Sequence, residues 1–153
     1  MIASIAVLAS ITRDEPPAGL PGLEGARLAT FGRRACAQLI DCVLNVLLGA
    51  LAGLRSDPWL PTLVGWAIVV CFWTFFGATP GKMAMQLRIV AVSAPERVGL
   101  PVATAISRLL GCVVSGIALN LGYLHMIKDP RRQCWHDRWA GTLVVRMGPD
   151  PAP

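Results

Sequence analysis

Charged residues are scarce in this sequence. Only 15% of its 153 residues are Asp, Glu, Lys or Arg, and 54% are hydrophobic, whereas a soluble domain usually has about 25% charged residues. The net charge is nevertheless +5, and most basic residues stand at the ends of apolar runs, where membrane proteins place them. A nucleic-acid binder would instead carry them on a polar folded surface. The composition therefore favours a protein of the lipid bilayer and argues against a nucleic-acid partner.

The sequence also lacks the patterns of disulfide frameworks, metal sites and enzymes. Its five cysteines form no CxxC pair, and four lie in apolar runs, which predicts small, buried, reduced residues. Cys134, His136 and Asp137 are close together, but no second pair of metal ligands has a familiar spacing. No convincing nucleophile accompanies His136 and Asp137 for acid–base chemistry. We therefore expect neither an enzyme nor a protein that holds a metal or cofactor.

The stretch FFGATPGKM, Phe75–Met83, is similar to a phosphate-binding loop but lacks its spacing. A Walker A loop places four residues between its first glycine and the Gly-Lys pair, and then Ser or Thr. Here three residues separate Gly77 from Gly81, and Met83 follows Lys82. We therefore expect no nucleotide site. The pattern predicts instead that Gly77 ends a helix and that Lys82 contacts lipid headgroups.

Two apolar stretches predict helices that cross the membrane. The first, Ala35–Leu54, carries one charge, Asp41, and at about 1.5 Å per residue it is long enough for the hydrocarbon layer. The second, Trp59–Phe76, has aromatic residues near both ends, as is typical of helices that reach both bilayer interfaces.

A third apolar stretch, Pro101–Ile127, contains Arg108 and conflicts with a simple crossing. Because basic residues favour the cytoplasmic side, the basic residues near the first span place the N-terminus there. A full third crossing would leave five basic residues outside the cell: Lys128, Arg131, Arg132, Arg138 and Arg146. We therefore predict a broken, re-entrant pair, with one helix over Val102–Ser115, a turn over residues 116–120 and a shorter helix to Ile127. Both termini would then be cytoplasmic.

The predicted fold class is an all-α integral membrane protein. It has two transmembrane helices, a broken third helical region and a small cytoplasmic ribbon of two antiparallel strands. The strands are Leu87–Val92 and residues 141–147, which are rich in β-branched residues. We divide the chain into an N-terminal tail and Pro/Gly-rich linker (1–29), a membrane domain (30–146) and a C-terminal tail (147–153). Residues 1–11 are apolar but too short to span a bilayer.

Polar residues follow one face of the first predicted helix. Gln38, Asp41 and Asn45 are spaced three and four residues apart, as on one side of a helix, and Arg34 extends this stripe outward. A bare carboxylate in lipid is expensive, so the stripe must face another helix, a partner subunit or water. Two interpretations stay open. Asp41 either pairs with Arg108 and stabilises the bundle, or it is a proton or cation site used in transport.

Two further charged residues have structural interpretations. Arg108 either pairs with Asp41 or extends to the headgroups, as long basic side chains near helix ends do. Asp137 is predicted to accept hydrogen bonds from backbone N–H groups or from Arg34 at the membrane surface.

Three blocks of the sequence, in order, resemble the RDD family of small bacterial membrane proteins. They are FGRRACAQLID, GATPGKMAMQLRIV and LGYLHMIKDPRRQCWHDRWAGTLVV, and the resemblance extends over about Thr30–Arg146. The family is named for one arginine and two aspartates, which by this resemblance are Arg34, Asp41 and Asp137. The resemblance implies that the three act together, and that the protein has a part in transporting ligands that are not identified.

The expected function is a transport-related role in the bacterial inner membrane, with cation or proton exchange through a site centred on Asp41. The polar network would comprise Arg34, Asp41, Asn45, Arg108 and Asp137. So few helices make a poor conduit alone, so we expect a homo-oligomer or a larger membrane partner. The alternative is a scaffold or accessory subunit that does not transport, whose Arg/Asp network is structural and whose basic face binds anionic headgroups.

Overall fold

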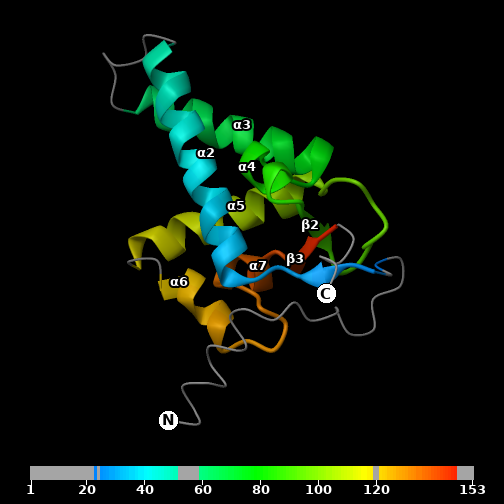
Figure 1. Ribbon diagram of the computed structural model, residues 1–153. Coiled ribbons are helices and arrows are strands. Elements are labelled where there is room, and N and C mark those ends of the chain that lie inside the picture. The colour runs from blue at the N-terminus through cyan, green and yellow to red at the C-terminus, as the bar shows by residue number, and fades with distance from the viewer. Residues whose placement is uncertain (1–22, 24, 52–58, 119–120, 148–153) are drawn as a thin grey trace.

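The computed structural model describes residues 23, 25–51, 59–118 and 121–147. Within these ranges, the longer helices lie on one side of a small sheet (Figure 1). In chain order the elements are β1 (Arg27–Leu28), α2 (Phe31–Leu51), α3 (Leu60–Phe76), α4 (Pro80–Ala84), β2 (Leu87–Ala91), α5 (Val102–Ile117), α6 (Leu121–Leu124), η2 (His125–Ile127), α7 (Trp135–Trp139) and β3 (Thr142–Arg146).

Helices α2 and α3 occupy the two stretches in which transmembrane helices were predicted. Helix α2 has 21 residues and is, in the described part of the chain, the one unbroken helix long and apolar enough to cross a bilayer. Helix α3 is apolar but has 17 residues. The last residues of the first predicted span, 52–54, lie outside the described ranges. The helical prediction is therefore confirmed, while the crossing of the membrane by α2 and by α3 stays a prediction.

The outer surfaces of these helices are apolar and exposed. Large side chains on them include Leu39, Val46, Leu51, Leu63 and Phe75. A soluble monomer rarely exposes so many large apolar groups together, so the surface suits lipid. Three of the cysteines, Cys36, Cys42 and Cys71, are also exposed. The prediction that the cysteines are buried is wrong for these three, because Cys36 and Cys71 are exposed on α2 and α3, and Cys42 borders an open space between helices.

The predicted break in the third apolar stretch is confirmed. Helix α5 ends at Ile117, and the segment formed by α6 and η2 runs at 108° to it. The two segments touch closely after the bend, because a Cβ atom added at Gly122 would lie 2.9 Å from the Cβ of Ser115. The bend returns the chain to α7, which lies beside the sheet, and then to β3, which is part of the sheet (Figure 1).

The sheet has three antiparallel strands in the order β1-β3-β2. Strands β2 and β3 pair as predicted, from Leu87 opposite Arg146 to Ala91 opposite Thr142. The prediction of a two-stranded ribbon is wrong, because β1 also pairs with β3, with Leu28 opposite Val145. This strand lies at the end of the segment that we assigned to the N-terminal tail. It covers an edge of β3 that would otherwise expose unpaired backbone groups.

Both faces of the sheet are covered by apolar side chains. On one face, Ile89 and Val144 pack with Ala37, Trp73, Leu100 and Ala105 from the helical side. On the other face, Val90, Leu143 and Val145 pack with Leu23, Ala26 and Leu28. Successive strand residues point to opposite faces, so the three consecutive apolar residues in the middle of β3, Leu143–Val145, fit a strand buried on both sides.

Helix α3 ends at Gly77, as predicted. Gly77 has φ +65°, and its N–H donates to the carbonyl of Trp73. Replacing it with alanine should lower the free energy of unfolding by about 1–2 kcal/mol, because a side chain is disfavoured at this φ. A Cβ atom there would also lie 3.1 Å from the carbonyl oxygen of Ile89. The loss should appear in thermal unfolding followed by circular dichroism in detergent.

Gly116→Ala is the matched control for Gly77→Ala. A Cβ atom at Gly116, within α5, meets nothing within 4 Å, and alanine should stabilise the helix by about 0.5–1 kcal/mol. Equal effects of the two substitutions would show that the conformation at Gly77 is not what stabilises this turn.

Candidate functional site

A cavity of about 350 Å³ lies between α2, α3, α4 and α5; we call it the Asp41 cavity. Its polar lining consists of Gln38, Asp41, Asn45, Thr79 and Lys82, and its aromatic lining of Trp66, Phe72, Trp73 and Tyr123. The polar stripe of α2 was expected to face another helix, a partner subunit or water, and Gln38, Asp41 and Asn45 face a space between helices. Three of the five predicted network residues, Arg34, Arg108 and Asp137, are not part of this lining.

The carboxylate of Asp41 is held by the turn that begins α4. Thr79 Oγ1 donates to Oδ2 over 2.5 Å, and the Gly81 N–H donates to Oδ1 over 2.7 Å. A Cβ atom at Gly81 would lie 2.2 Å from the carbonyl oxygen of Ala37 and 2.8 Å from Asp41 Oδ1. Only glycine therefore lets this turn approach α2 so closely. The sequence similar to a phosphate loop binds a carboxylate of its own chain.

Lys82 lies beside the same carboxylate. Its Nζ is 3.9 Å from Asp41 Oδ2 and 3.4 Å from Thr79 Oγ1, and the residue is 8% exposed. The prediction that Lys82 contacts headgroups is wrong, because the short helix α4 packs this side chain against α2. Burial lowers the pKa of the Lys82 ammonium. The positive charge of Arg108 lowers it further, and the negative charge of Asp41 opposes both effects.

Asn45 completes the polar wall one turn further along α2. A Cβ atom added at Gly65 in α3 would lie 2.7 Å from Asn45 Nδ2 and 3.0 Å from Oδ1. The glycine therefore lets the amide of Asn45 lie directly against the backbone of α3. This contact joins α2 and α3 on one side of the Asp41 cavity.

Asp137 forms a second polar cluster, next to the sheet. It is fully buried, and its Oδ2 and Oδ1 lie 2.5 Å from Arg34 Nη1 and 2.5 Å from Arg108 Nη1, respectively. The N–H of Cys134 also donates to Oδ2, over 3.0 Å. The prediction that Asp137 accepts hydrogen bonds from the backbone and from Arg34 is confirmed. Its two arginine neighbours outweigh the effect of burial and hold the pKa of Asp137 far below its usual range.

The structure contradicts both interpretations of Arg108 that the sequence left open. Arg108 is 1% exposed, so it does not extend to headgroups, and it pairs with Asp137 and not with Asp41. Its guanidinium lies 5.2 Å from the centroid of the Trp73 ring and also donates to Thr142 Oγ1. Sequence could not reveal this partner, because the choice between two carboxylates depends on how α5 turns against α7.

The predicted network is therefore two clusters. In the described part of the chain, no ion pair or hydrogen bond joins the Asp41 cluster to the Asp137 cluster, although α2 contributes Asp41 to one and Arg34 to the other. Sequence reasoning missed Thr79 and Gly81 as partners of Asp41. Their signal was present, since the family resemblance includes the block GATPGKMAMQLRIV.

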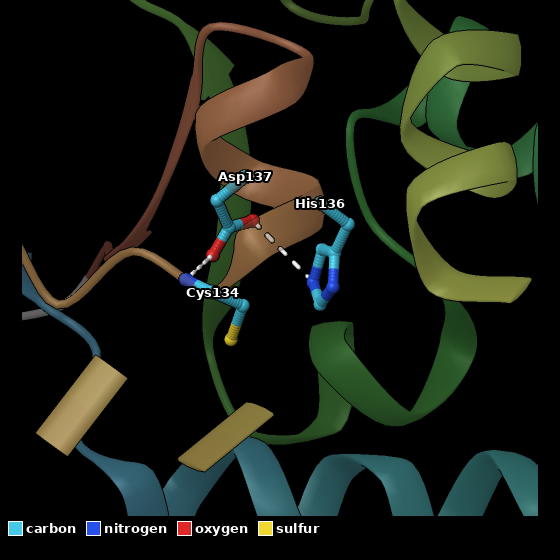
Figure 2. Close-up of side chains that lie close together, drawn as sticks. All are labelled: Cys134, His136 and Asp137. Atoms are coloured by element: carbon cyan, nitrogen blue, oxygen red, sulfur yellow. Dashed lines mark hydrogen bonds and ion pairs between the residues drawn. The ribbon is translucent and has the colours of Figure 1, made fainter. Parts of the chain in front are cut away.

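Cys134, His136 and Asp137 lie together at the start of α7 (Figure 2). One potential ligand atom from each lies within 4.8 Å of the others. Burial is the main reason that the pKa of the Cys134 thiol rises to about 12, whereas metals bind the thiolate. The two arginines on Asp137 would also repel a cation. The trio is therefore better explained as support for α7, in which Asp137 caps the first turn.

Removing the charge of Asp137 should strongly destabilise the protein. Asp137→Asn would leave Arg34 and Arg108 buried without their counter-charge, which we expect to lower the free energy of unfolding by about 3–5 kcal/mol. Glu96→Gln is the control, because Glu96 is exposed and removing its charge should change the free energy of unfolding little. Thermal unfolding in detergent measures both, and similar losses would contradict the structural role of Asp137.

Acid should destabilise the protein through His136. Burial lowers the pKa of His136 to about 3 in the folded protein, whereas an unfolded histidine has a pKa of about 6.5. Between these values the unfolded chain binds one more proton, so stability falls as pH falls. Unfolding should be followed between about pH 7 and 4.5, above the range in which Asp137 titrates.

His136→Gln should reduce this pH dependence. His125→Gln is the control, because the His125 side chain is 33% exposed and lies outside the cluster. An unchanged pH dependence in His136→Gln would contradict the burial of a neutral imidazole.

Comparison with known proteins identifies the family of this chain. Neither the curated proteins nor the solved structures give a significant match. A profile of the RDD family matches residues 28–141, a range that includes the Asp41 cavity lining and both arginine–aspartate contacts. With three quarters of the chain matched in this way, the protein belongs to the RDD family.

Proposed function

We propose that this protein exchanges a cation for a proton across the bacterial inner membrane, at the Asp41 cavity. One observation carries the proposal: Asp41 lines a cavity of about 350 Å³ and lies next to a buried lysine. Ionisable groups at membrane depth are rare and mark ion pathways more often than other features. The apolar outer faces of α2 and α3 suit the surrounding lipid.

The pair of Asp41 and Lys82 gives this exchange a physical basis. With Lys82 protonated, its ammonium neutralises Asp41. A cation that enters beside Asp41 repels the Lys82 ammonium and partly replaces it as the counter-charge of the carboxylate. Both effects lower the pKa of Lys82, so its proton leaves more easily. One positive charge then enters as one proton departs, and the net charge of the cavity is unchanged. Arg108, Arg34 and Asp137 keep their own pairing throughout.

Exchange requires that the cavity open to each side of the membrane in turn. The bent segment of α5, α6 and η2 contributes Leu109, Cys112 and Tyr123 to the cavity lining. This segment would be the element that moves. We expect a homo-oligomer or a larger membrane partner to complete the path, with both termini and the basic residues toward the cytoplasm and its anionic headgroups.

A scaffold or accessory role is the second candidate. It is favoured by the Asp137 cluster, in which two of the three naming residues, Arg34 and Asp137, are buried against each other and do not line the Asp41 cavity. In this alternative Asp41 also serves packing, by fixing α4 to α2 through Thr79 and Gly81.

Asp41→Asn tests the proposal. Wild-type protein in proteoliposomes that contain a pH-sensitive dye should change the internal pH when sodium, potassium or an organic ammonium salt is added outside. The Asn variant keeps a similar shape: its Oδ1 can still accept the Gly81 N–H and its amide NH₂ can donate to Thr79 Oγ1, but it lacks the charge. We expect its exchange rate to fall by at least about tenfold, a loss equivalent to about 1.4 kcal/mol.

Asp129→Asn is the matched control, since it removes one carboxylate outside the cavity. It should exchange ions like the wild type. If Asp41→Asn folds and exchanges at the wild-type rate, or if the wild type moves none of these cations, the exchange proposal is wrong and the scaffold role is favoured.

A further inference from the structure

We propose that the Asp41 cavity takes an organic cation with an aromatic or similar apolar body, and not a bare metal ion. The inference rests on the proposed function only in placing the ligand site at Asp41; binding itself does not require transport. It follows from the size of the cavity, the few oxygen atoms in it and the aromatic rings around it.

The cavity is too large for a metal ion alone. Its volume is about 350 Å³, at the lower end of the roughly 300–1,000 Å³ typical of small-molecule sites. Since a water molecule occupies about 30 Å³ of liquid, the space corresponds to about a dozen waters. Most of the lining residues are apolar, among them Leu44, Leu48, Ile68, Val69 and Leu109, and such walls hold water poorly.

The cavity also offers too few free oxygen atoms for a metal ion. Metal ions such as Ca²⁺ and Mg²⁺ take about six oxygen ligands. Both oxygens of Asp41 already accept hydrogen bonds, from Thr79 and from Gly81. Gln38 and Asn45 add one amide oxygen each. The two hydroxyl oxygens of the lining are already engaged, that of Thr79 with Asp41 and Lys82 and that of Tyr123 with Cys112. A cation that needs the charge of Asp41 but no complete shell of ligands fits this arrangement better.

Aromatic rings supply the rest of the binding surface. Trp66, Phe72 and Tyr123 line the cavity, and the faces of such rings attract cations within about 6 Å. The chain already uses this interaction nearby, since the Arg108 guanidinium lies 5.2 Å from the centroid of the Trp73 ring. An aryl or alkyl ammonium ion would place its charge near Asp41 and its body among these rings.

The charges around the cavity favour a cation over an anion. Asp41 is its one carboxylate and Lys82 its one basic residue in the lining. Arg34 and Arg108 from α2 and α5 are both paired with Asp137, so neither is free to bind an anion. Release of the Lys82 proton, as proposed above, leaves Asp41 as the unpaired charge of the cavity, and binding should therefore strengthen as pH rises.

The test measures binding by full-length protein in lipid nanodiscs, using isothermal titration calorimetry. The probes are phenyltrimethylammonium, tetramethylammonium and sodium ions. Phenyltrimethylammonium should bind at least about tenfold more tightly than tetramethylammonium, because the added ring is buried among aromatic side chains. Sodium should bind most weakly. Empty nanodiscs give the background from partition into lipid.

Substitutions then separate charge from the apolar wall. Asp41→Asn should weaken binding of phenyltrimethylammonium by at least about tenfold, and Trp66→Leu by about threefold to tenfold. Cys42→Trp fills part of the cavity without changing a charge, and should also weaken binding. Trp139→Leu is the control for loss of an indole, because Trp139 is 60% exposed and lies outside the cavity. It should leave affinity unchanged.

The outcomes distinguish this inference from the exchange proposal. Tight sodium binding without binding of the aryl cation would overturn the ligand class, and would leave exchange at Asp41 standing. Aryl-cation binding that needs Asp41, Trp66 and an unfilled cavity, in a protein that moves no ions in liposomes, would support the site and overturn exchange. If the three cavity variants bind like the wild type, the ligand does not occupy this cavity and the inference is wrong.

Discussion

The buried contact of Asp137 with Arg34 and Arg108 is the interaction on which the other features of this structure depend. Taking three charges out of water is unfavourable unless they compensate one another, so each must be held where the others can reach it. Arg34 comes from the first turn of α2, Arg108 from the middle of α5 and Asp137 from α7. Their contact therefore fixes the base of α2 and the middle of α5 against α7 and the strand that follows it.

The Asp41 cavity exists because this base is fixed while the rest of α2 is supported differently. Above Arg34, α2 meets the rest of the molecule through the α4 turn at Asp41 and through Asn45 against Gly65. Between these contacts the helices do not close on each other, and a space with one carboxylate, one lysine and several aromatic rings remains. Family membership is consistent with this division, since two of the naming residues build the base and the third lines the cavity.

Sequence reasoning succeeded where the signal was local or periodic. The apolar runs predicted α2 and α3, and the turn residues predicted the end of α3 at Gly77. The basic residues on both sides of the third apolar stretch predicted that this stretch is broken. Sequence reasoning failed where the partner lies far along the chain. Arg108 could have met Asp41 or Asp137, and nothing in composition or spacing decides between them. The third strand was missed because β1 has two residues and follows a segment rich in proline and glycine.

The sequence by itself determined the apolar faces, the helix-ending glycine and the presence of one arginine and two aspartates in family blocks, because these depend on the properties of neighbouring residues. Only the tertiary structure decided which charges pair, that Lys82 is buried beside Asp41, and that α2, α3, α4 and α5 enclose a cavity. These features depend on distances between segments up to about a hundred residues apart, and such distances are set by how closely helices pack. That packing is governed here by Gly81, at which any side chain would meet the backbone of α2, and is assisted by Gly65, which leaves room for the amide of Asn45.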